Sequence, residues 1–325
     1  MKHILIDTDA GVDDALAIIF ALASPELAVE GITTVGGNIP VEPATRNVFT
    51  ILDTLFPAVY PLVAEGAAAP LGRELETAAH VHGADGLGNI SELRLADGSP
   101  KYPRTMHDLM DMTAADFIIE EAYRHGRNLT IIALGPLTNI AEAIRTSPTA
   151  MKGVGEIIIM GGAFRVYGNT SPVAEFNMYV DPEAAETVIG FDVPKTIVPL
   201  DVTEQVILLR SELEARFAAN PSPVLEFARD VSGFYMDFHA HSDGFDGCYM
   251  HDPTTIALAI NPSLARTVPA EVHVERQGEF TRGMTVADLR PERANRYHPN
   301  AQVCVEIDAK ACLDLFFSKI AKSSQ

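Results

Sequence analysis

Short runs of β-branched residues alternate with amphipathic helical stretches along almost the whole chain, and this alternation restricts the fold more than any other feature. The runs expected to form strands are residues 3–6, 28–35, 58–63, 129–134, 155–160, 195–200 and 302–307. The stretches expected to form helices are residues 13–23, 43–55, 114–124, a segment beginning near 138, 182–189 and 313–322. Strands connected by helices predict an α/β fold with an open, mostly parallel central sheet flanked by helices.

Two segments depart from this alternation. Residues 64–104 are rich in Gly, Ala, Pro and His and show little periodicity, so we expect a long loop, a feature that is usually functional inside a compact domain. Residues 270–288 contain two alternating runs around Arg276-Gln277-Gly278 and predict a hairpin. Because no repeat or linker-like break interrupts the chain, we expect one domain spanning residues 1–325.

Composition excludes several classes of partner. The 325 residues include 24 Lys and Arg against 44 Asp and Glu, and the resulting net charge of −20 disfavours nucleic acids and anionic membranes. No apolar run approaches the roughly 20 residues of a membrane helix, and the first residues do not resemble a signal peptide. The cysteines, Cys248, Cys304 and Cys312, lack metal-type spacing, so we expect a reduced, cytoplasmic protein.

Four carboxylates follow the first predicted strand within eight residues: Asp7, Asp9, Asp13 and Asp14. Carboxylates at a helix N-terminus would account for Asp13 and Asp14 but not for Asp7 and Asp9. Ligands of open α/β sheets bind at the carboxyl ends of strands, where four such groups would repel one another unless a cation neutralised them. Oxygen-only ligation favours Ca²⁺ or Mg²⁺ over zinc.

Two known kinds of protein place carboxylates in a similar way. An EF-hand loop does not fit, because Gly11 and Ile18 stand where oxygen ligands belong. Phosphohydrolases of the haloacid dehalogenase type also have Asp-x-Asp after the first strand, and a Mg²⁺-dependent enzyme with Asp7 as nucleophile and Asp9 as acid stays an alternative. That family expects Thr or Val at the position of Gly11.

Polar or glycine-rich sequences follow other predicted strands too. These are residues 33–38, 134–139, 160–162 with 168–170 and 174–177, and 249–253. Each alone indicates little more than a turn. Together they place amides, carboxylates and a histidine on one rim of the sheet, which suits a ligand rich in hydroxyl groups.

In combination, these motifs resemble the inosine–uridine-preferring nucleoside hydrolases, which cleave the N-glycosidic bond of ribonucleosides. The resemblance rests on Asp7-Thr8-Asp9-Ala10-Gly11-Val12-Asp13-Asp14-Ala15, Gly36-Gly37-Asn38, Gly135-Pro136-Leu137-Thr138-Asn139, Met160-Gly161-Gly162, Asn169, Glu175, Asn177, His251-Asp252-Pro253 and Gly283 to Asp288. It covers essentially the whole chain and implies the Rossmann-like nucleoside hydrolase fold. Ala10 replaces the family's usual Pro, which we expect to cost rigidity but no chemistry.

The resemblance also implies roles for individual residues. One Ca²⁺ would be held by Asp7, Asp9, Asp14, Asp252 and the backbone carbonyl of Leu134. Asp9 would be the general base that activates a Ca²⁺-bound water, with direct attack and inversion at C1′. The substrate would be bound by Asp13, Asn38, His82, Asn169, Glu175 and Asn177, and His251 would be the acid that assists the leaving base.

Several points stay open at this stage. The acid could be His251, His82, His239, His241 or Tyr235, and the aromatic segment 234–241 could instead be a buried helix face. A non-catalytic nucleoside-binding protein is a further alternative, which the presence of Asp9 disfavours. The resemblance implies a role in purine or pyrimidine salvage and a homodimer or homotetramer, without deciding the preferred base or between the two assemblies.

Overall fold

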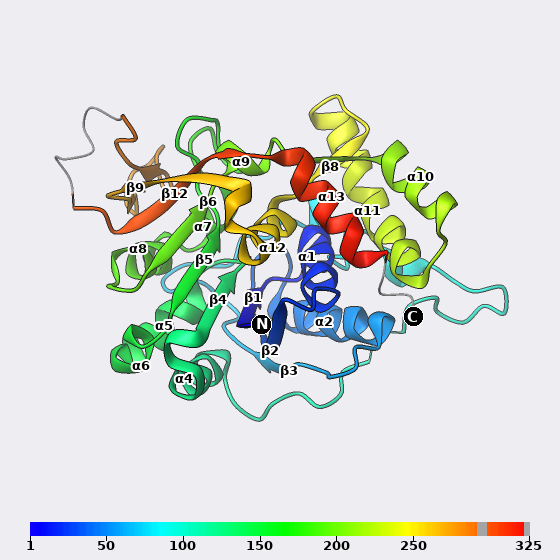
Figure 1. Ribbon diagram of the computed structural model, residues 1–325, viewed down its shortest axis with the longest axis horizontal. Coiled ribbons are helices and arrows are strands. Elements are labelled where there is room, and N and C mark those ends of the chain that lie inside the picture. The colour runs from blue at the N-terminus through cyan, green and yellow to red at the C-terminus, as the bar shows by residue number, and fades with distance from the viewer. Residues whose placement is uncertain (104, 291–297, 322–325) are drawn as a thin grey trace.

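The computed structural model describes residues 1–103, 105–290 and 298–321, and it is organised around one eight-stranded sheet (Figure 1). The strands of this sheet, in spatial order, are β3 (Leu62–Glu65), β2 (Leu27–Thr34), β1 (Lys2–Thr8), β4 (Leu129–Ala133), β5 (Glu156–Met160), β6 (Lys195–Val198), β12 (Ala301–Ile307) and β9 (Ala265–Ala270). All neighbours are parallel except β12 and β9. The predicted α/β fold with a mostly parallel sheet is confirmed.

Helices cover both faces of the sheet. The α-helices are α1 (Val12–Leu22), α2 (Val41–Leu55), α3 (Ala79–His82), α4 (Ala114–His125), α5 (Thr138–Thr146), α6 (Pro148–Lys152), α7 (Phe176–Val180), α8 (Pro182–Gly190), α9 (Leu200–Thr203), α10 (Arg210–Ala219), α11 (Pro223–Ser242), α12 (His251–Ile260) and α13 (Ala309–Ile320). Short 3₁₀ turns lie at η1 (Ile90–Glu92), η2 (Gly126–Asn128) and η3 (Pro262–Leu264). Figure 1 shows α4, α5, α6 and α8 on one side of the sheet and α1, α2, α11, α12 and α13 on the other.

The hydrophobic core is correspondingly divided in two. Successive side chains of a strand point to opposite faces, so in β1 Ile4 and Ile6 join the core under α1 and α12 while Leu5 joins the core under α4 and α5. All three side chains are fully buried. A strand buried on both faces reads as a continuous apolar run, which is why β1, β4 and β5 are recognisable in the sequence.

The strand order reverses between β1 and β4, and this reversal positions the functional site. From β1 the chain proceeds through β2 to β3 at one edge, then returns to β4 and continues through β5 and β6 in the other direction. Ligands of open α/β sheets bind at the carboxyl ends of the strands at such a switch point. Asp7 lies near the carboxyl end of β1, residues 9–14 follow that strand, and Leu134 directly follows β4.

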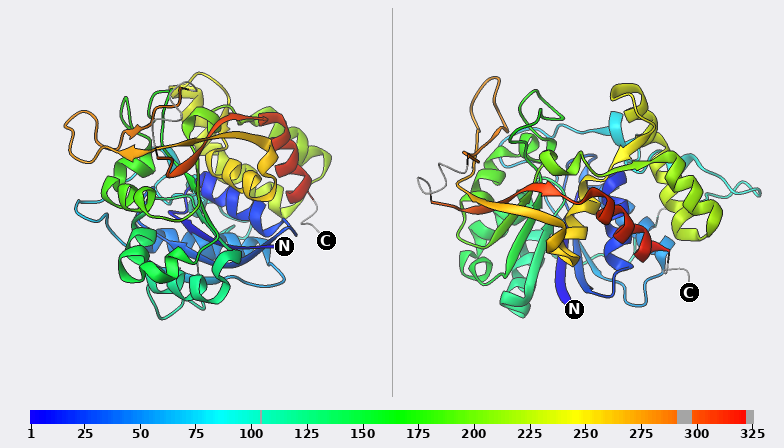
Figure 2. Two further views of the ribbon diagram at one scale, coloured as in Figure 1. Left: turned by 60° about the vertical axis from the view of Figure 1, so that its left-hand side comes forward. Right: turned by 45° about the horizontal axis from the view of Figure 1, so that its top comes forward.

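Two small antiparallel pairs complete the fold. β7 (Ile207–Leu209) pairs with β8 (Gly247–Tyr249) and brackets α10 and α11. β10 (His273–Val274) pairs with β11 (Thr285–Val286), which confirms the predicted hairpin, and the orange loop between them projects from the body (Figure 2). Within the described residues, no helix is long and apolar enough to cross a membrane.

Some predicted boundaries are wrong. The third strand begins at Leu62, not at residue 58, because Pro57 and Pro61 flank an exposed turn and a proline cannot donate to the ladder. The last helix begins at Ala309, capped by Asp308, four residues before its predicted start. Most of residues 64–104 is loop as expected, interrupted by α3 and η1, whereas residues 104 and 322 of the predicted elements lie outside the described residues.

Candidate active site

The turn between β1 and α1 is held by its own side chains. The Thr8 hydroxyl donates to Asp14 Oδ1, and the backbone N–H of Gly11 donates to Asp14 Oδ2 (2.8 Å), so Asp14 caps the helix from within its first turn. Ala10 has φ 45°, a left-handed conformation, and its carbonyl accepts from Asn47 Nδ2 (3.1 Å). A proline is fixed near φ −65° and could not adopt this turn, so Ala10 changes the turn itself as well as its rigidity.

Five aspartates converge at the carboxyl end of β1, and all are at most 5% exposed: Asp7, Asp9, Asp13, Asp14 and Asp252. Asp252 comes from the first turn of α12, which packs against α1. One carboxylate oxygen from each of Asp13, Asp14 and Asp252 lies within 4.8 Å of the others, a group that could hold a metal ion. Asp13, which we expected at the ribose, is therefore also placed in the acidic cluster.

Burial raises the pKa of each of these carboxyl groups, because a charge removed from water loses its hydration. The pKa of Asp7 rises to about 7, chiefly through burial, although hydrogen bonds from Asn139 and Thr33 oppose the shift. For Asp9 and Asp13 the nearby Asp14 charge adds to the effect of burial. A bound cation would oppose these shifts, because its positive charge favours the ionised form of the nearby carboxyl groups.

Two carboxylate oxygens of the cluster are buried and accept no hydrogen bond from the described residues: Asp7 Oδ2 and Asp13 Oδ1. The other oxygen of Asp7 accepts from Thr33 Oγ1 (2.5 Å) and Asn139 Nδ2 (2.8 Å). Leaving a buried acceptor without a partner costs about 1–3 kcal/mol. Buried carboxylate oxygens of this kind are the donors that a hard cation such as Ca²⁺ takes.

Asn38 fixes the orientation of Asp9. The Asn38 backbone N–H donates to Asp9 Oδ2 (2.6 Å) and its side-chain amide donates to Oδ1 (3.1 Å), and the same amide lies 3.2 Å from Asp14 Oδ2. Gly37 leaves room for this arrangement, because a Cβ atom there would lie 2.0 Å from Asp9 Oδ2. The Gly36-Gly37-Asn38 motif after β2 thus both holds the Asp9 carboxylate and makes space for it.

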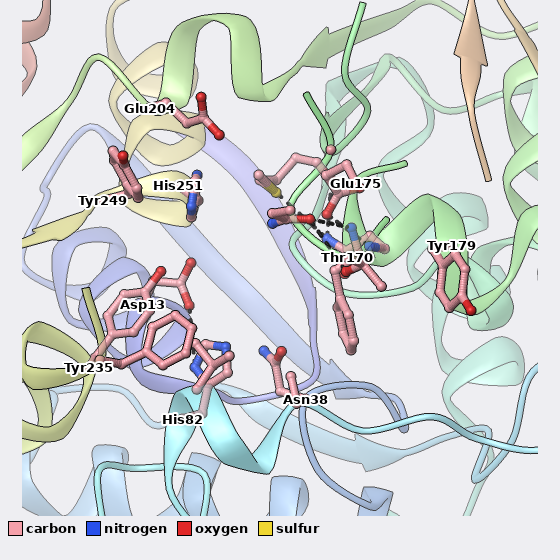
Figure 3. A pocket seen from close by; sticks show the side chains of 18 of the residues that line it. Asp13, Asn38, His82, Thr170, Glu175, Tyr179, Glu204, Tyr235, Tyr249 and His251 are labelled. Carbon is pink, nitrogen blue, oxygen red and sulfur yellow. Dashed lines mark hydrogen bonds and ion pairs between the residues drawn. The ribbon is translucent and has the colours of Figure 1, made fainter. Parts of the chain in front are cut away.

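A cavity of about 910 Å³ opens above the cluster (Figure 3), within the size range of small-molecule sites. Of the residues predicted for the site, those that line it are Asp13, Asn38, His82, Leu134, Asn169, Glu175, Asn177, His251 and Asp252. Asp7, Asp9 and Asp14 lie in the layer beneath. Arg165 is the one Lys or Arg among the described lining residues, so the cavity favours neutral or cationic ligands.

The β5 side of the cavity is built around α7. The Glu175 carboxylate caps this helix, accepting from the N–H groups of Asn177 (2.8 Å) and Met178 (3.2 Å) and from Gly162 N (3.1 Å). Asn177 Nδ2 donates to the carbonyl of Leu134 (2.7 Å), which has a second lone pair to offer. Glu175 therefore supports this wall as well as facing the cavity.

Histidines and aromatic rings form the opposite wall (Figure 3). The backbone N–H of Val12 donates to His82 Nδ1 (3.1 Å), and the His82 ring stacks on Tyr235 with centroids 5.3 Å apart. Burial lowers the pKa of His82 to about 3 and that of His251 to about 3. A neutral His82 whose Nδ1 accepts must carry its proton on Nε2, which can donate to a ligand. His251 Nδ1 lies 2.7 Å from Thr203 Oγ1.

The aromatic segment 234–241 lies on α11. From the sequence it could be either a source of the acid or a buried helix face, and it contains residues of both kinds. Tyr235 and His239 are buried, yet both line the cavity. His239 Nδ1 contacts Asp243 Oδ2 (2.6 Å), whereas its buried Nε2 has no hydrogen-bond partner among the described residues. His241 is exposed and is not among the residues that line the cavity, which separates it from the other candidate acids.

Sequence reasoning missed two lining residues near His251, namely Glu204 and Tyr249 (Figure 3). Burial, with Asp201 and Asp243 nearby, raises the pKa of Glu204 to about 7. Glu204 follows β6 and α9, so its place beyond a strand end was a signal that could have found it. Tyr249 ends β8, whose pairing with β7 could not be foreseen from the sequence.

Comparison with known proteins gives consistent matches over nearly the whole chain. A profile of the family described as inosine-uridine preferring nucleoside hydrolase matches residues 4–314. The chain is 40% identical over 318 residues to pyrimidine-specific ribonucleoside hydrolase RihA of Escherichia coli O9:H4 (strain HS), covering 98% of this chain and 97% of that protein. The corresponding enzyme of Enterobacter sp. (strain 638) is 38% identical over 322 residues, covering 99% and 98%.

Solved structures agree. The purine-preferring ribonucleoside hydrolase from Gardnerella vaginalis superposes with a TM-score of 0.90 at 32% identity, and the coverage is 99% of both chains. The plant nucleoside hydrolase PpNRh1 gives a TM-score of 0.89 at 35% identity, again over 99% of both chains.

Proposed function

The chain belongs to the inosine-uridine preferring nucleoside hydrolase family and is a ribonucleoside hydrolase, and from this premise we propose that it is a Ca²⁺-dependent enzyme with Asp9 as general base. The observation that carries the proposal is the buried acidic cluster at the switch point, where Asp7 Oδ2 and Asp13 Oδ1 accept no hydrogen bond from the described residues and Asp13 lines the cavity. The cluster supplies a cation site and a base, and the cavity supplies room for a nucleoside.

The donor set fits Ca²⁺. Asp7, Asp9, Asp14, Asp252 and the carbonyl of Leu134 offer only oxygen, the ligand type that calcium takes in sets of about six to eight. Asp13, grouped with Asp14 and Asp252, is a further oxygen donor within reach. When bound, Ca²⁺ would orient the ribose hydroxyls and acidify water less strongly than zinc does.

Asp9 accepts a proton from the attacking water in this proposal. Its carboxylate is 1% exposed and is held by two hydrogen bonds from Asn38, so it cannot rotate away from the reacting water. General-base catalysis of this kind contributes about 10²–10⁴-fold to the rate. Water attacks C1′ directly, the N-glycosidic bond breaks, and the configuration at C1′ inverts.

The ribose acquires positive charge as the bond to the base breaks, as in other glycosidases. Asp13, Asn38, Asn169, Glu175 and Asn177 surround the part of the cavity assigned to the sugar. Their oxygen atoms stabilise that charge because they are fixed before the reaction begins. Asn169 illustrates this, since its Oδ1 is already held by the backbone N–H of Phe176 (2.9 Å).

The leaving base lies against the wall of histidines and aromatic rings. We assign His251 the donation of a hydrogen bond or proton to the base, because it adjoins Asp252 and faces the cavity. His82 and His239 are further possible donors that line the same cavity. Tyr235 and Tyr249 provide flat apolar surfaces for the base.

We further propose a pyrimidine ribonucleoside as substrate, because the curated relatives at 38–40% identity carry pyrimidine-specific in their names. The test is release of ribose from uridine, cytidine, inosine, adenosine and guanosine, with and without EDTA. Chelator-sensitive hydrolysis that is fastest with uridine or cytidine supports both the metal dependence and the pyrimidine preference. Faster release from the purine nucleosides would overturn the base preference alone, and hydrolysis insensitive to EDTA would overturn the metal assignment.

Substitution of Asp9 by Asn tests the role of the base. We expect a loss of turnover of about 10²–10⁴-fold with Ca²⁺ still bound, measured by ribose release and by calorimetric titration with Ca²⁺. Asp237→Asn on the exposed face of α11 is a matched control that should leave turnover unchanged. A turnover for Asp9→Asn within threefold of wild type would exclude Asp9 as the base.

The two alternative functions are not favoured, because the relatives are named hydrolases of ribonucleosides and not phosphohydrolases or binding proteins. We also propose a cytoplasmic homodimer or homotetramer. The three cysteines are buried free thiols, as in a reducing compartment. Light scattering coupled to size-exclusion chromatography would decide between the two assemblies, and a monomeric mass would exclude both.

A further inference from the structure

A second group of side chains of the kinds that bind metals lies near the amino end of β1, whereas the active site lies at the carboxyl end. His3 belongs to the start of β1, Glu30 to β2 and His125 to the last turn of α4. One ligand atom from each of these residues lies within 4.8 Å of the other two. His3 and Asp7 are four residues apart along β1, roughly 13 Å at about 3.3 Å per residue, so this group is separate from the acidic cluster.

The ligand atoms of this group are already close to the separations that a bound zinc ion requires. His3 Nδ1 lies 2.5 Å from Glu30 Oε1, and His125 Nε2 lies 3.9 Å from Glu30 Oε2. The two imidazole rings lie 4.6 Å apart between centroids. Tetrahedral zinc with bonds of about 2.0–2.2 Å would hold its ligand atoms about 3.4 Å from one another, so shifts of around an ångström suffice.

Buried polar atoms that make ion pairs but no hydrogen bonds within the described part of the chain lie beside this group. His125 Nε2 and both oxygens of Glu121 are buried, and none has a hydrogen-bond partner among the described residues. Glu121 is fully buried, with Oε2 3.2 Å from His125 Nε2 and Oε1 2.8 Å from Arg124 Nη1. Glu121 thus adds a second, fully buried carboxylate beside His125, held in place by its ion pair with Arg124.

A bulge in the sheet supplies Glu30. Ile4 of β1 pairs with Val29, but Leu5 pairs with Gly31, so Glu30 is the extra residue in the β1–β2 ladder. A bulge of this kind re-aims one side chain and is often found beside functional sites. Here it coincides with the turn of the Glu30 carboxylate towards His3.

We propose that His3, Glu30 and His125 form a binding site for a transition-metal dication of the Zn²⁺ type, with Glu121 as the fourth donor. Two imidazole nitrogens with carboxylate oxygens form a mixed set that suits Zn²⁺, whereas Ca²⁺ prefers oxygen alone. The ion would tie β1, β2 and α4 together at the amino end of the sheet. The site is independent of the catalytic cluster and of the reaction assigned to it.

The experiment is a calorimetric titration of the chelator-treated full chain with Zn²⁺ in the presence of excess Ca²⁺, which occupies the aspartates. We expect one equivalent of Zn²⁺ to bind and the midpoint of thermal unfolding to rise. Co²⁺ in place of Zn²⁺ should give visible absorption bands of the intensity of four-coordinate cobalt. Asp14→Asn, which disrupts the acidic cluster, should retain this equivalent.

His3→Ala and His125→Ala should each weaken Zn²⁺ binding by about tenfold or more. Glu30→Gln preserves the shape of the side chain and should also weaken Zn²⁺ binding. This variant keeps the test valid if a histidine variant does not fold. His273→Ala is the matched control, because His273 lies 3.5 Å from each of two carboxylates, Glu186 and Glu271, but is 59% exposed. Failure of the wild type to bind Zn²⁺, or equal binding by the His3, His125 and Glu30 variants, would overturn the proposal.

Discussion

Replacing Gly37 with alanine should remove most of the turnover, although position 37 is not among the residues that line the cavity. The new Cβ would lie 2.0 Å from Asp9 Oδ2, 2.7 Å from its Cγ and 2.8 Å from its Cβ. Non-bonded atoms settle at separations of about 3.5 Å or more, so the carboxylate must withdraw by roughly 1.5 Å. The main chain has little freedom to yield, because the Gly37 N–H is bonded to the Ile39 carbonyl (3.1 Å).

The size of the effect follows from that displacement. A misplacement of about 1 Å at a reacting group can cost about 10²-fold, and full loss of a general base costs about 10²–10⁴-fold. We therefore expect kcat to fall by about 10²–10³-fold, or about 3–4 kcal/mol of activation free energy. Overpacking should lower the free energy of unfolding by only about 1–3 kcal/mol.

The assay is ribose release at saturating uridine and Ca²⁺, with folding followed by circular dichroism. Because the effect is transmitted through Asp9, Gly37→Ala should add little to the loss already caused by Asp9→Asn, a clear departure from additivity. Gly233→Ala on α11 is the control, because a Cβ there would meet no atom of the described residues within 4 Å. A folded Gly37→Ala enzyme with turnover within threefold of wild type would refute the reasoning, as would full additivity with Asp9→Asn.

Three further predictions concern the metal, the sugar and a buried lysine. Ca²⁺ at 100 times its Kd should stabilise the wild type by about 2.7 kcal/mol in thermal unfolding but have little effect on Asp14→Asn, and equal shifts would contradict the assigned site. 2′-Deoxyuridine should turn over far more slowly than uridine, because it lacks a hydroxyl that the proposal places on the metal; equal rates would count against that contact. Burial lowers the pKa of Lys195 to about 8, so from pH 8 to 10.5 the unfolded chain binds more protons and this group's contribution to the unfolding free energy rises with pH. Urea unfolding of wild type and Lys195→Met should diverge by about 3 kcal/mol over that range, and parallel curves would disprove the shift.

The parts of the fold that could be predicted are those governed by local pattern. β1, β4 and β5 are buried on both faces, so their apolar runs are continuous. The turn at Asp9–Gly11 predicts the start of the helix that follows. β3 was misplaced because residues 58–63 are apolar enough for a strand. The sheet pairs only Leu62–Glu65 with β2, and this choice depends on the partner strand.

The candidate site divides in the same way. Asp7, Asp9, Asp13 and Asp14 are adjacent in the chain and could be proposed as one cluster from their spacing. Which of the candidate acids face the cavity could not be predicted from the sequence. His239 and His241 are only two residues apart, yet His239 is buried at the cavity and His241 is exposed. Only the orientation of α11 against α1 and β8 separates them.

The alternation of strands and helices and the acidic turn after the first strand can be predicted from short segments, because hydrophobic periodicity and adjacent charges are local properties. Long-range packing brings Asp252 to Asp14, raises the pKa values of the whole cluster through burial, and brings His3, Glu30 and His125 together near the amino end of β1. These outcomes depend on the packing of segments far apart in the chain and on the water which that packing excludes. No local pattern encodes either quantity.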